Sequence, residues 1–240
     1  MWGSGNRGLR RMCGRFTAKM TWAEIVARYR LTMKAPPHNL RPIYNICPTD
    51  PVDVIIAEED TRSLVQMRWG LIPRWWSKPL KETKIATFNA RVETVDTKPF
   101  FRDAYKRTRC LIPLSGYFEW ENTPNGKQPW YFTARDGSPI LTAAGLWDEW
   151  KNRETGEKQK SCTMIITEPN EFVAEVHDRM PALLSEDQFQ PWLSGEAGKE
   201  ILLPAPNDYL QRWAVSKRVN SSKADKDDVA LIEKVKVEAA

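Results

Sequence analysis

The amino-acid sequence predicts an α+β fold in which a mostly antiparallel β-sheet is surrounded by short peripheral helices. The chain has 240 residues, 41% of them hydrophobic, which suits one globular domain with a full core. Its 17 prolines and 11 tryptophans indicate many loops and strands. Between residues 110 and 167, short apolar runs are separated by dipeptides suited to tight hairpins, which are Asn125-Gly126, Asp136-Gly137 and Thr155-Gly156. We therefore expect an antiparallel meander at the structural centre of the molecule.

The N-terminal third predicts a short helix followed by two strands. Thr21 and Glu24 have the spacing of a capping box, and apolar residues recur at helical spacing from residue 22 to residue 29. After a proline-rich loop, residues 52–57 and 64–71 are apolar enough to form buried strands, with a polar turn between them.

Further short helices are predicted from caps and apolar spacing. Residues 97–107 have helical spacing behind Thr97, whose hydroxyl can cap a helix. Asn170 can cap a helix that stops near His177, and a second capping box begins at Ser185. These helices are expected to support the sheet from its periphery.

Alternation along the strands predicts which polar side chains share a face. On the first strand of the meander, Tyr117, Glu119 and Glu121 point away from the aromatic residues between them. Asn89 and Arg91 share a side-chain direction if residues 85–94 are extended, so they can face one site together. A carboxylate on a strand is usually solvent-facing, and this alternative stays open for Glu119.

Two adjacent tryptophans, Trp75 and Trp76, follow Arg74 in a loop with no pattern that would bury both rings. Such rings can stack on unpaired bases, which contributes about 1–3 kcal/mol per base whatever the base sequence. The alternative is that both tryptophans belong to the core.

Composition and charge exclude several classes of protein. The net charge of +5 fits a polyanionic partner, although it also fits an ordinary soluble protein. The cysteines show no CxxC or metal-like spacing and only two histidines accompany them, so we predict no metal and no cofactor. No apolar run approaches the ~20 residues needed to span a bilayer, and the first eleven residues lack the apolar core of a signal peptide. We expect a cytoplasmic protein with reduced thiols that does not associate with membranes.

The dipeptide Met12-Cys13 places a cysteine directly after a possible translation start. If Met12 were removed, Cys13 would carry both an α-amine and a thiol. In model peptides the pKa of an α-amine is roughly 7.7–8.0 and that of a cysteine thiol is about 8.5. Together these groups can capture an aldehyde: the amine forms an imine, and the thiol closes a five-membered thiazolidine. The alternative is an inert cysteine near a chain terminus.

Four short motifs occur in order along the chain. They are MCGRF at 12–16, NARVET at 89–94, GYFEW at 116–120 and HDRMP at 177–181. In this order and spacing they resemble the SOS-response-associated peptidase (SRAP) family over about residues 12–220. The resemblance implies a single SRAP-like domain with a barrel-like sheet and a role in DNA repair. In that family an N-terminal cysteine crosslinks to abasic sites in single-stranded DNA through a thiazolidine.

The resemblance also implies roles for individual residues. Glu119 orients and deprotonates the amine of Cys13, His177 acts as general acid or base at the sugar oxygen, and Asn89 hydrogen-bonds the sugar or the terminal residue. Phosphates and bases are contacted by Arg15, Trp75, Trp76, Arg91 and Arg179. The implied partner is single-stranded DNA with abasic sites, bound by a monomer that is nucleoid-associated when on DNA. The family name implies a peptidase, a hydrolase that removes whatever precedes the cysteine, besides lyase-like chemistry on damaged DNA.

One departure separates this sequence from the family pattern, because residues 1–11 precede the Met-Cys start. While they are attached, Cys13 has an amide nitrogen and cannot form the ring. Translation starts at Met12, or the extension is cut away, or this copy does not crosslink; we favour these in that order. Two other functions stay open: a non-covalent module for single-stranded or damaged DNA, and a thiol protease with Cys13 and His177 as its dyad. The predicted organisation is an extension (1–11), an SRAP-like domain (12–220) and a polar C-terminal segment (221–240).

Overall fold

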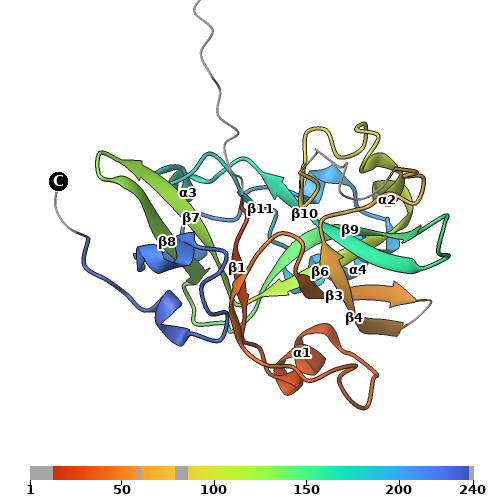
Figure 1. Ribbon diagram of the computed structural model, residues 1–240, viewed down its shortest axis with the longest axis horizontal. Coiled ribbons are helices and arrows are strands. Elements are labelled where there is room, and N and C mark those ends of the chain that lie inside the picture. The colour runs from red at the N-terminus through yellow and green to blue at the C-terminus, as the bar shows by residue number, and fades with distance from the viewer. Residues whose placement is uncertain (1–12, 59–60, 79–85, 238–240) are drawn as a thin grey trace, which may run out of the picture.

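The computed structural model describes residues 13–58, 61–78 and 86–237. Within these residues, two β-sheets form the body of the molecule and short helices lie at its periphery (Figure 1). The predicted α+β class, one domain with a mainly antiparallel, barrel-like sheet, is confirmed. The predicted extension, residues 1–11, and Met12 lie outside the described residues.

The first sheet has five strands in the order β12-β8-β7-β1-β2, and all its pairs are antiparallel. The strands are β1 (Phe16–Ala18), β2 (Ile43–Ile46), β7 (Gly116–Thr123), β8 (Gly126–Ala134) and β12 (Leu210–Ala214). Phe16 pairs with Tyr117, which fixes the start of the described chain beside β7. Gly116 permits the close approach of β8 on the other side of β7, because a Cβ there would lie 2.4 Å from the ring of Tyr131.

The second sheet includes a closed five-stranded barrel. The strands of the whole sheet are β3 (Pro51–Glu58), β4 (Thr61–Trp69), β5 (Asn89–Arg91), β6 (Arg109–Leu114), β9 (Leu141–Lys151), β10 (Lys158–Thr167) and β11 (Met180–Pro181). The ladder runs from β10 through β4, β3 and β6 to β9, and β9 pairs back with β10. Closure leaves no unpaired edge in this ring of strands. Strand β10 also pairs in parallel with β5 and antiparallel with β11, so it joins three segments that are distant in the sequence.

The predicted meander over residues 110–167 is wrong in its pairing. Strand β6 pairs with β9 in the barrel, whereas the β7–β8 hairpin belongs to the other sheet. Asn125-Gly126 and Thr155-Gly156 each join two paired strands, but Asp136-Gly137 lies where the chain passes between the sheets. Only Ser115 separates β6 from β7. Dipeptides of this kind specify a local reversal of the chain, and they do not specify which strands become neighbours.

Short helices flank the sheets: α1 (Trp22–Tyr29), α2 (Arg102–Arg107), α3 (Glu171–Ala174), α4 (Phe189–Ser194), η2 (Glu186–Gln188), η3 (Lys199–Ile201), η4 (Lys217–Asn220) and η5 (Val229–Ile232). The predicted capping boxes at Thr21 and Ser185 are present, and Asn170 caps α3. The helix predicted behind Thr97 instead begins at Arg102. The Thr97 hydroxyl donates to the carbonyl of Thr94, within a series of turns that precedes α2.

The main core lies between the two sheets. It includes Phe16 from the first sheet and Trp69 from the second, whose rings meet edge-on with centroids 4.9 Å apart. This contact fixes β1 against the barrel. In the part of the chain that the structure describes, no helix has the length and apolarity to cross a membrane.

Residues 221–237 of the predicted polar C-terminal segment pack against the first sheet. The amide of Tyr44 in β2 donates to the carbonyl of Lys226 (2.7 Å), and the amide of Val235 donates to the carbonyl of Ala214 in β12 (2.9 Å). The side chain of Leu231 in η5 is fully buried. The segment therefore contributes to one side of the first sheet; the domain boundary at residue 220 stays a prediction.

Candidate active site

Cys13 lies just before β1 and is almost completely buried, with 3% of its surface exposed. The side-chain amide of Asn89 donates to the Cys13 carbonyl (2.9 Å), and the thiol lies 3.9 Å from the carbonyl of Arg179. Asn89 belongs to β5 and Arg179 precedes β11, and both strands pair with β10. Strand β10 thus brings two of the sequence motifs to Cys13.

Glu119, on β7, is fully buried beside Cys13. Burial raises the pKa of its carboxyl to about 8; the Cys13 thiol and main-chain N–H oppose this shift, and the negative charge of Asp178 adds to it. Among the described residues, however, neither Glu119 oxygen accepts a hydrogen bond of standard geometry. A carboxyl with this pKa exchanges protons near neutral pH, as a general base must.

His177 connects Glu119 to the surface. Its Nδ1 lies 3.6 Å from Oε2 of Glu119 and 3.5 Å from Oδ1 of Asp178, and its side chain is 11% exposed. Nδ1 also lies 3.2 Å from the main-chain nitrogen of Arg179 and 3.3 Å from the carbonyl oxygen of the same residue. The imidazole is therefore oriented by the residue that also approaches the Cys13 thiol.

Several buried polar atoms around Cys13 have no hydrogen-bond partner in the described part of the chain. Besides both Glu119 oxygens, the hydroxyl of Tyr117 and Oδ1 of Asn89 lack hydrogen bonds within the described residues. Burial, together with the charges of Cys13 and Glu119, raises the pKa of Tyr117. Burial and the nearby Glu119 likewise raise the pKa of the Cys13 thiol. Because buried polar groups are normally satisfied, this cluster indicates a place for a polar ligand.

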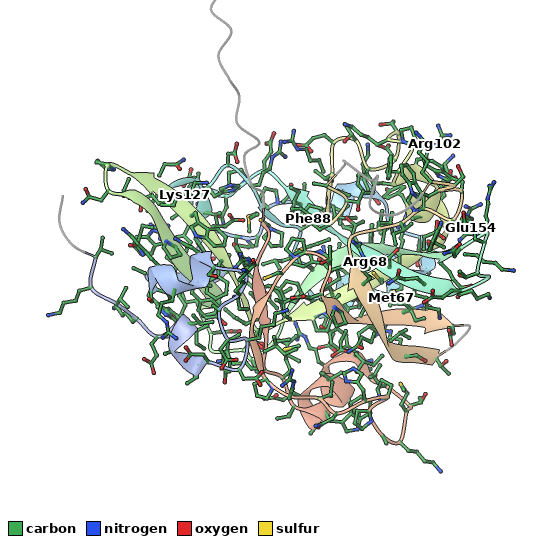
Figure 2. The ribbon with its side chains drawn as sticks, in the orientation of Figure 1. Met67, Arg68, Phe88, Arg102, Lys127 and Glu154 are labelled. Atoms are coloured by element: carbon green, nitrogen blue, oxygen red, sulfur yellow. The ribbon has the colours of Figure 1, made fainter. Side chains whose placement is uncertain are left out.

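A groove of about 950 Å³ adjoins this cluster. Its walls include Arg15, Trp120, Lys127, His177, Asp178 and Lys223. Lys127 projects from the β7–β8 hairpin (Figure 2). Three cations from distant parts of the chain therefore border one groove, and His177 reaches both the groove and Glu119. The described residues contain no group of three or more His, Cys, Asp or Glu that could hold a metal ion.

Arg15 is bound by neutral groups of the protein itself. Its guanidinium donates to Oδ1 of Asn45 (2.8 Å) and to the carbonyl of Val219 (2.6 Å), with longer contacts to the next two carbonyls. None of the described carboxylates forms an ion pair with it. Arg15 thus anchors the end of η4 at the groove while its positive charge stays unneutralised there.

The other two predicted phosphate-binding arginines differ in their surroundings. Arg91 is exposed at the end of β5. Arg179 forms an ion pair with Glu93, and this contact lowers the pKa of Glu93 although burial opposes the shift. A phosphate would have to compete with Glu93 for Arg179.

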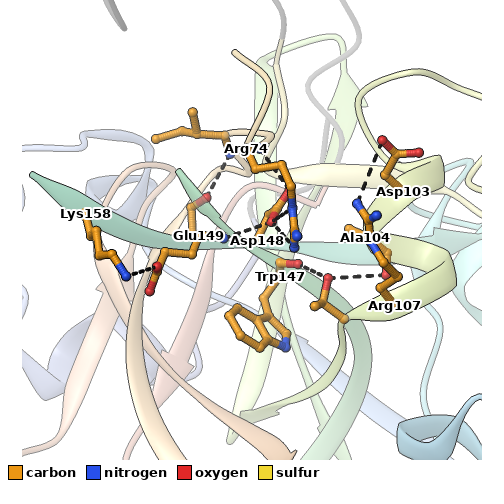
Figure 3. A network of polar contacts seen from close by, with 11 residues as sticks. Arg74, Asp103, Ala104, Arg107, Trp147, Asp148, Glu149 and Lys158 are labelled. Carbon is orange, nitrogen blue, oxygen red and sulfur yellow. Dashed lines mark hydrogen bonds and ion pairs between the residues drawn. The ribbon is translucent and has the colours of Figure 1, made fainter. Parts of the chain in front are cut away.

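Trp75 and Trp76 form an aromatic cluster with Phe100, whose ring centroid lies 5.4 Å from that of Trp75 and 5.5 Å from that of Trp76. Trp75 is 40% exposed. Arg74 holds this loop on β9: its side chain makes charge-assisted hydrogen bonds to the buried Asp148 at 2.7 and 2.8 Å, and its amide donates to the same carboxylate (Figure 3). The sequence alone gave no sign of this support, because Asp148 is 74 residues away.

Comparison with known proteins identifies the family. The model of the SOS response associated peptidase (SRAP) family matches residues 12–222. The abasic site processing protein YoaM of Bacillus subtilis is 34% identical over 219 residues, covering 88% of this chain and 94% of YoaM. The abasic site processing protein YedK of Escherichia coli is 30% identical, with 79% and 83% covered. A crystal structure of a protein from Bacteroides thetaiotaomicron matches with a TM-score of 0.83 at 24% identity, covering 93% of this chain and all of that one.

The chain belongs to the SRAP family. In this SRAP domain, the four motifs that carry the resemblance converge on one site. Cys13, Asn89, Glu119 and His177 each come from a different motif, and each contacts or closely approaches another member of the group. Sequence reasoning missed Tyr117 as a site residue, although its position two residues before Glu119 on one strand face was the available signal.

Proposed function

We propose that this SRAP protein processes abasic sites in DNA and that Cys13, when it is the first residue, forms a covalent thiazolidine with the abasic sugar. The observation that carries the proposal is the cluster around Cys13 of buried polar atoms of Asn89, Tyr117 and Glu119 that have no hydrogen-bond partner among the described residues. Such a cluster can receive a sugar's hydroxyl and aldehyde groups. Relatives named abasic site processing proteins support this substrate.

The chemistry balances without a cofactor. The α-amine of Cys13 adds to the aldehyde carbon and the adduct loses one water to give an imine. The thiol sulfur then bonds to the same carbon, and the thiol proton passes to the nitrogen. Glu119 accepts the proton that the amine releases, because its pKa of about 8 lies near that of an α-amine (roughly 7.7–8.0). His177 moves a proton at the sugar oxygen when the closed hemiacetal opens.

The DNA is held as an unpaired strand. Trp75 is exposed enough to stack on a base, and Trp76 and Phe100 support it from behind. Arg91 lies at the exposed end of β5, two residues from Asn89, where it can meet a flanking phosphate. We keep Arg15 and Arg179 as phosphate contacts, with Arg15 the stronger candidate because no described carboxylate neutralises it.

Peptidase activity, by the same proposal, removes the residues that precede Cys13. The main-chain nitrogen of Cys13, at which this bond would be cleaved, lies beside Glu119, which can move protons at that nitrogen. An ordinary thiol protease fits less well, because such enzymes lower the pKa of their cysteine, whereas burial raises the pKa of the Cys13 thiol.

The test compares two chains, one beginning at Cys13 and one retaining residues 1–12. Each is incubated with single-stranded DNA that carries one abasic site, and the products are separated on a denaturing gel after heating. We expect a heat-stable adduct only from the chain that begins at Cys13, and none from its Cys13→Ala variant. Cys47→Ala serves as the matched control, because Cys47 is an internal thiol at the same groove. Salt-sensitive binding without an adduct would favour the non-covalent module.

A further inference from the structure

A second, smaller cavity shares two walls, Pro48 and Phe88, with the groove at the active site. Its volume is about 170 Å³, below the ~300–1,000 Å³ of pockets that enclose drug-sized ligands. We call it the Arg68 cavity; its walls include Arg68, Trp69, Trp76, Thr87, Phe88 and Phe100. The space suits one planar ring system rather than a whole nucleotide.

The described residues satisfy the hydrogen-bond donors in the walls only in part. Arg68 is half-buried near the end of β4, and its Nη1 donates to the carbonyl of Gly70 (2.5 Å). It forms no ion pair with a carboxylate of the described chain, although a guanidinium has five N–H donors. The indole N–H of Trp76 is also buried without an acceptor among those residues. A ligand that satisfied these groups would have to present acceptors.

The remaining walls are aromatic. The rings of Trp69 and Phe88 meet edge-on with centroids 5.6 Å apart, and those of Trp76 and Phe100 are 5.5 Å apart. Flat apolar faces beside unsatisfied donors favour a flat ligand with acceptors along one edge. A phosphate group would satisfy the guanidinium but would leave the rings without a partner. A nucleobase satisfies both, and guanine presents two neighbouring acceptors, O6 and N7, that match a guanidinium.

The cavity lies one residue from the active site along the chain. Phe88 precedes Asn89, which donates a hydrogen bond to the carbonyl of Cys13, and Trp76 follows Trp75, which we propose stacks on a base. A strand whose abasic sugar lies at Cys13 would therefore bring a neighbouring base to this cavity.

We propose that the Arg68 cavity binds the base of a nucleotide that flanks the abasic site and that Arg68 favours guanine there. The proposal rests on the proposed function, since it requires the strand to lie at Cys13. The Arg68 cavity would add a sequence preference to the site, because the other contacts proposed above are to the sugar, to phosphates and to the faces of the bases.

The experiment measures binding of the full chain to single-stranded DNA that carries a reduced abasic analogue, which has no aldehyde and cannot crosslink. Each of the four bases is placed in turn on either side of the analogue, and affinity is read by fluorescence anisotropy. On one side of the analogue, we expect the strand with guanine to bind at least about fivefold tighter than the strand with adenine. This ratio is the lower end of what a bidentate arginine–guanine contact gives. Arg68→Gln should reduce that ratio to less than about twofold, leaving the affinity for strands with adenine there nearly unchanged.

Two further variants keep the result interpretable. Arg62→Gln removes a cation from the same face of β4 and should keep the guanine preference. Trp76→Phe keeps a ring in the cavity wall but removes its N–H, so it should reduce the preference for guanine. It provides the test if Arg68→Gln fails to fold. Equal affinities for all four bases, a preference for another base, or an equal loss for every base in Arg68→Gln would overturn the proposal. Crosslinking of aldehyde-bearing DNA is scored separately, so a failure of the base preference is distinguished from a failure of the proposed function.

Discussion

Replacing Glu119 by glutamine tests the electrostatics of the buried site. Burial raises the pKa of this carboxyl from an ordinary 4.5 to about 8. The folded protein therefore binds this proton more tightly than the unfolded chain does. The free energy of unfolding should fall as pH rises from about 4.5 to about 8 and then level off. At about 1.4 kcal/mol per unit, the shift corresponds to an upper bound of about 5 kcal/mol.

Glutamine keeps the shape of the side chain but cannot ionise, so Glu119→Gln should remove this pH dependence. We expect urea unfolding of the full chain, followed by tryptophan fluorescence, to show the variant gaining about 2–4 kcal/mol over the wild type between pH 5 and pH 8. Glu121→Gln, two residues along the same strand and partly exposed, is the matched control. Parallel pH profiles for wild type and Glu119→Gln would refute the assignment of a neutral, buried carboxyl.

Three further predictions concern the predicted DNA contacts and the acid–base residue. Trp75→Ala with Trp76→Ala should weaken binding to single-stranded DNA several-fold while the thermal melting curve stays cooperative; unchanged affinity would return both rings to a purely structural role. Arg15→Gln removes the charge-assisted hydrogen bonds that hold residues 219–221, so it should lower the free energy of unfolding by about 1–3 kcal/mol and speed amide exchange in residues 221–237. Unchanged amide exchange would contradict the anchoring role. His177→Ala should slow crosslinking by about 10²-fold or more with little change in affinity for undamaged DNA; equal losses of both would make His177 structural.

Local patterns in the sequence predicted much of the fold. The capping boxes and the hairpin at Asn125-Gly126 depend on residues within a few positions of each other, and the structure confirms them. Strand alternation correctly placed Tyr117 and Glu119 on one face: the two side chains are close enough that the charge of Glu119 helps to raise the pKa of Tyr117. The turns around Thr97 were misread as helix, because the same hydroxyl can cap a helix or close a turn.

The assembly of the site was beyond local patterns. Cys13 and Arg179 are 166 residues apart, and they meet because β10 pairs with strands from two other regions. Such pairings depend on packing across the whole barrel, which periodicity does not encode. The carbonyls that bind Arg15 and the carboxylate that pairs with Arg179 were hidden for the same reason. Only the family resemblance indicated that Glu119 and His177 share a site with Cys13.

The intact mass of the adduct tests the central claim most directly. A chain beginning at Cys13 is reacted with abasic single-stranded DNA without a reductant, and the product is weighed before and after borohydride treatment. The thiazolidine account predicts a mass equal to chain plus DNA minus one water in both spectra, because the closed ring leaves no imine to reduce. An adduct that gains two hydrogens on treatment, or one formed by a chain that still carries residues before Cys13, would contradict it.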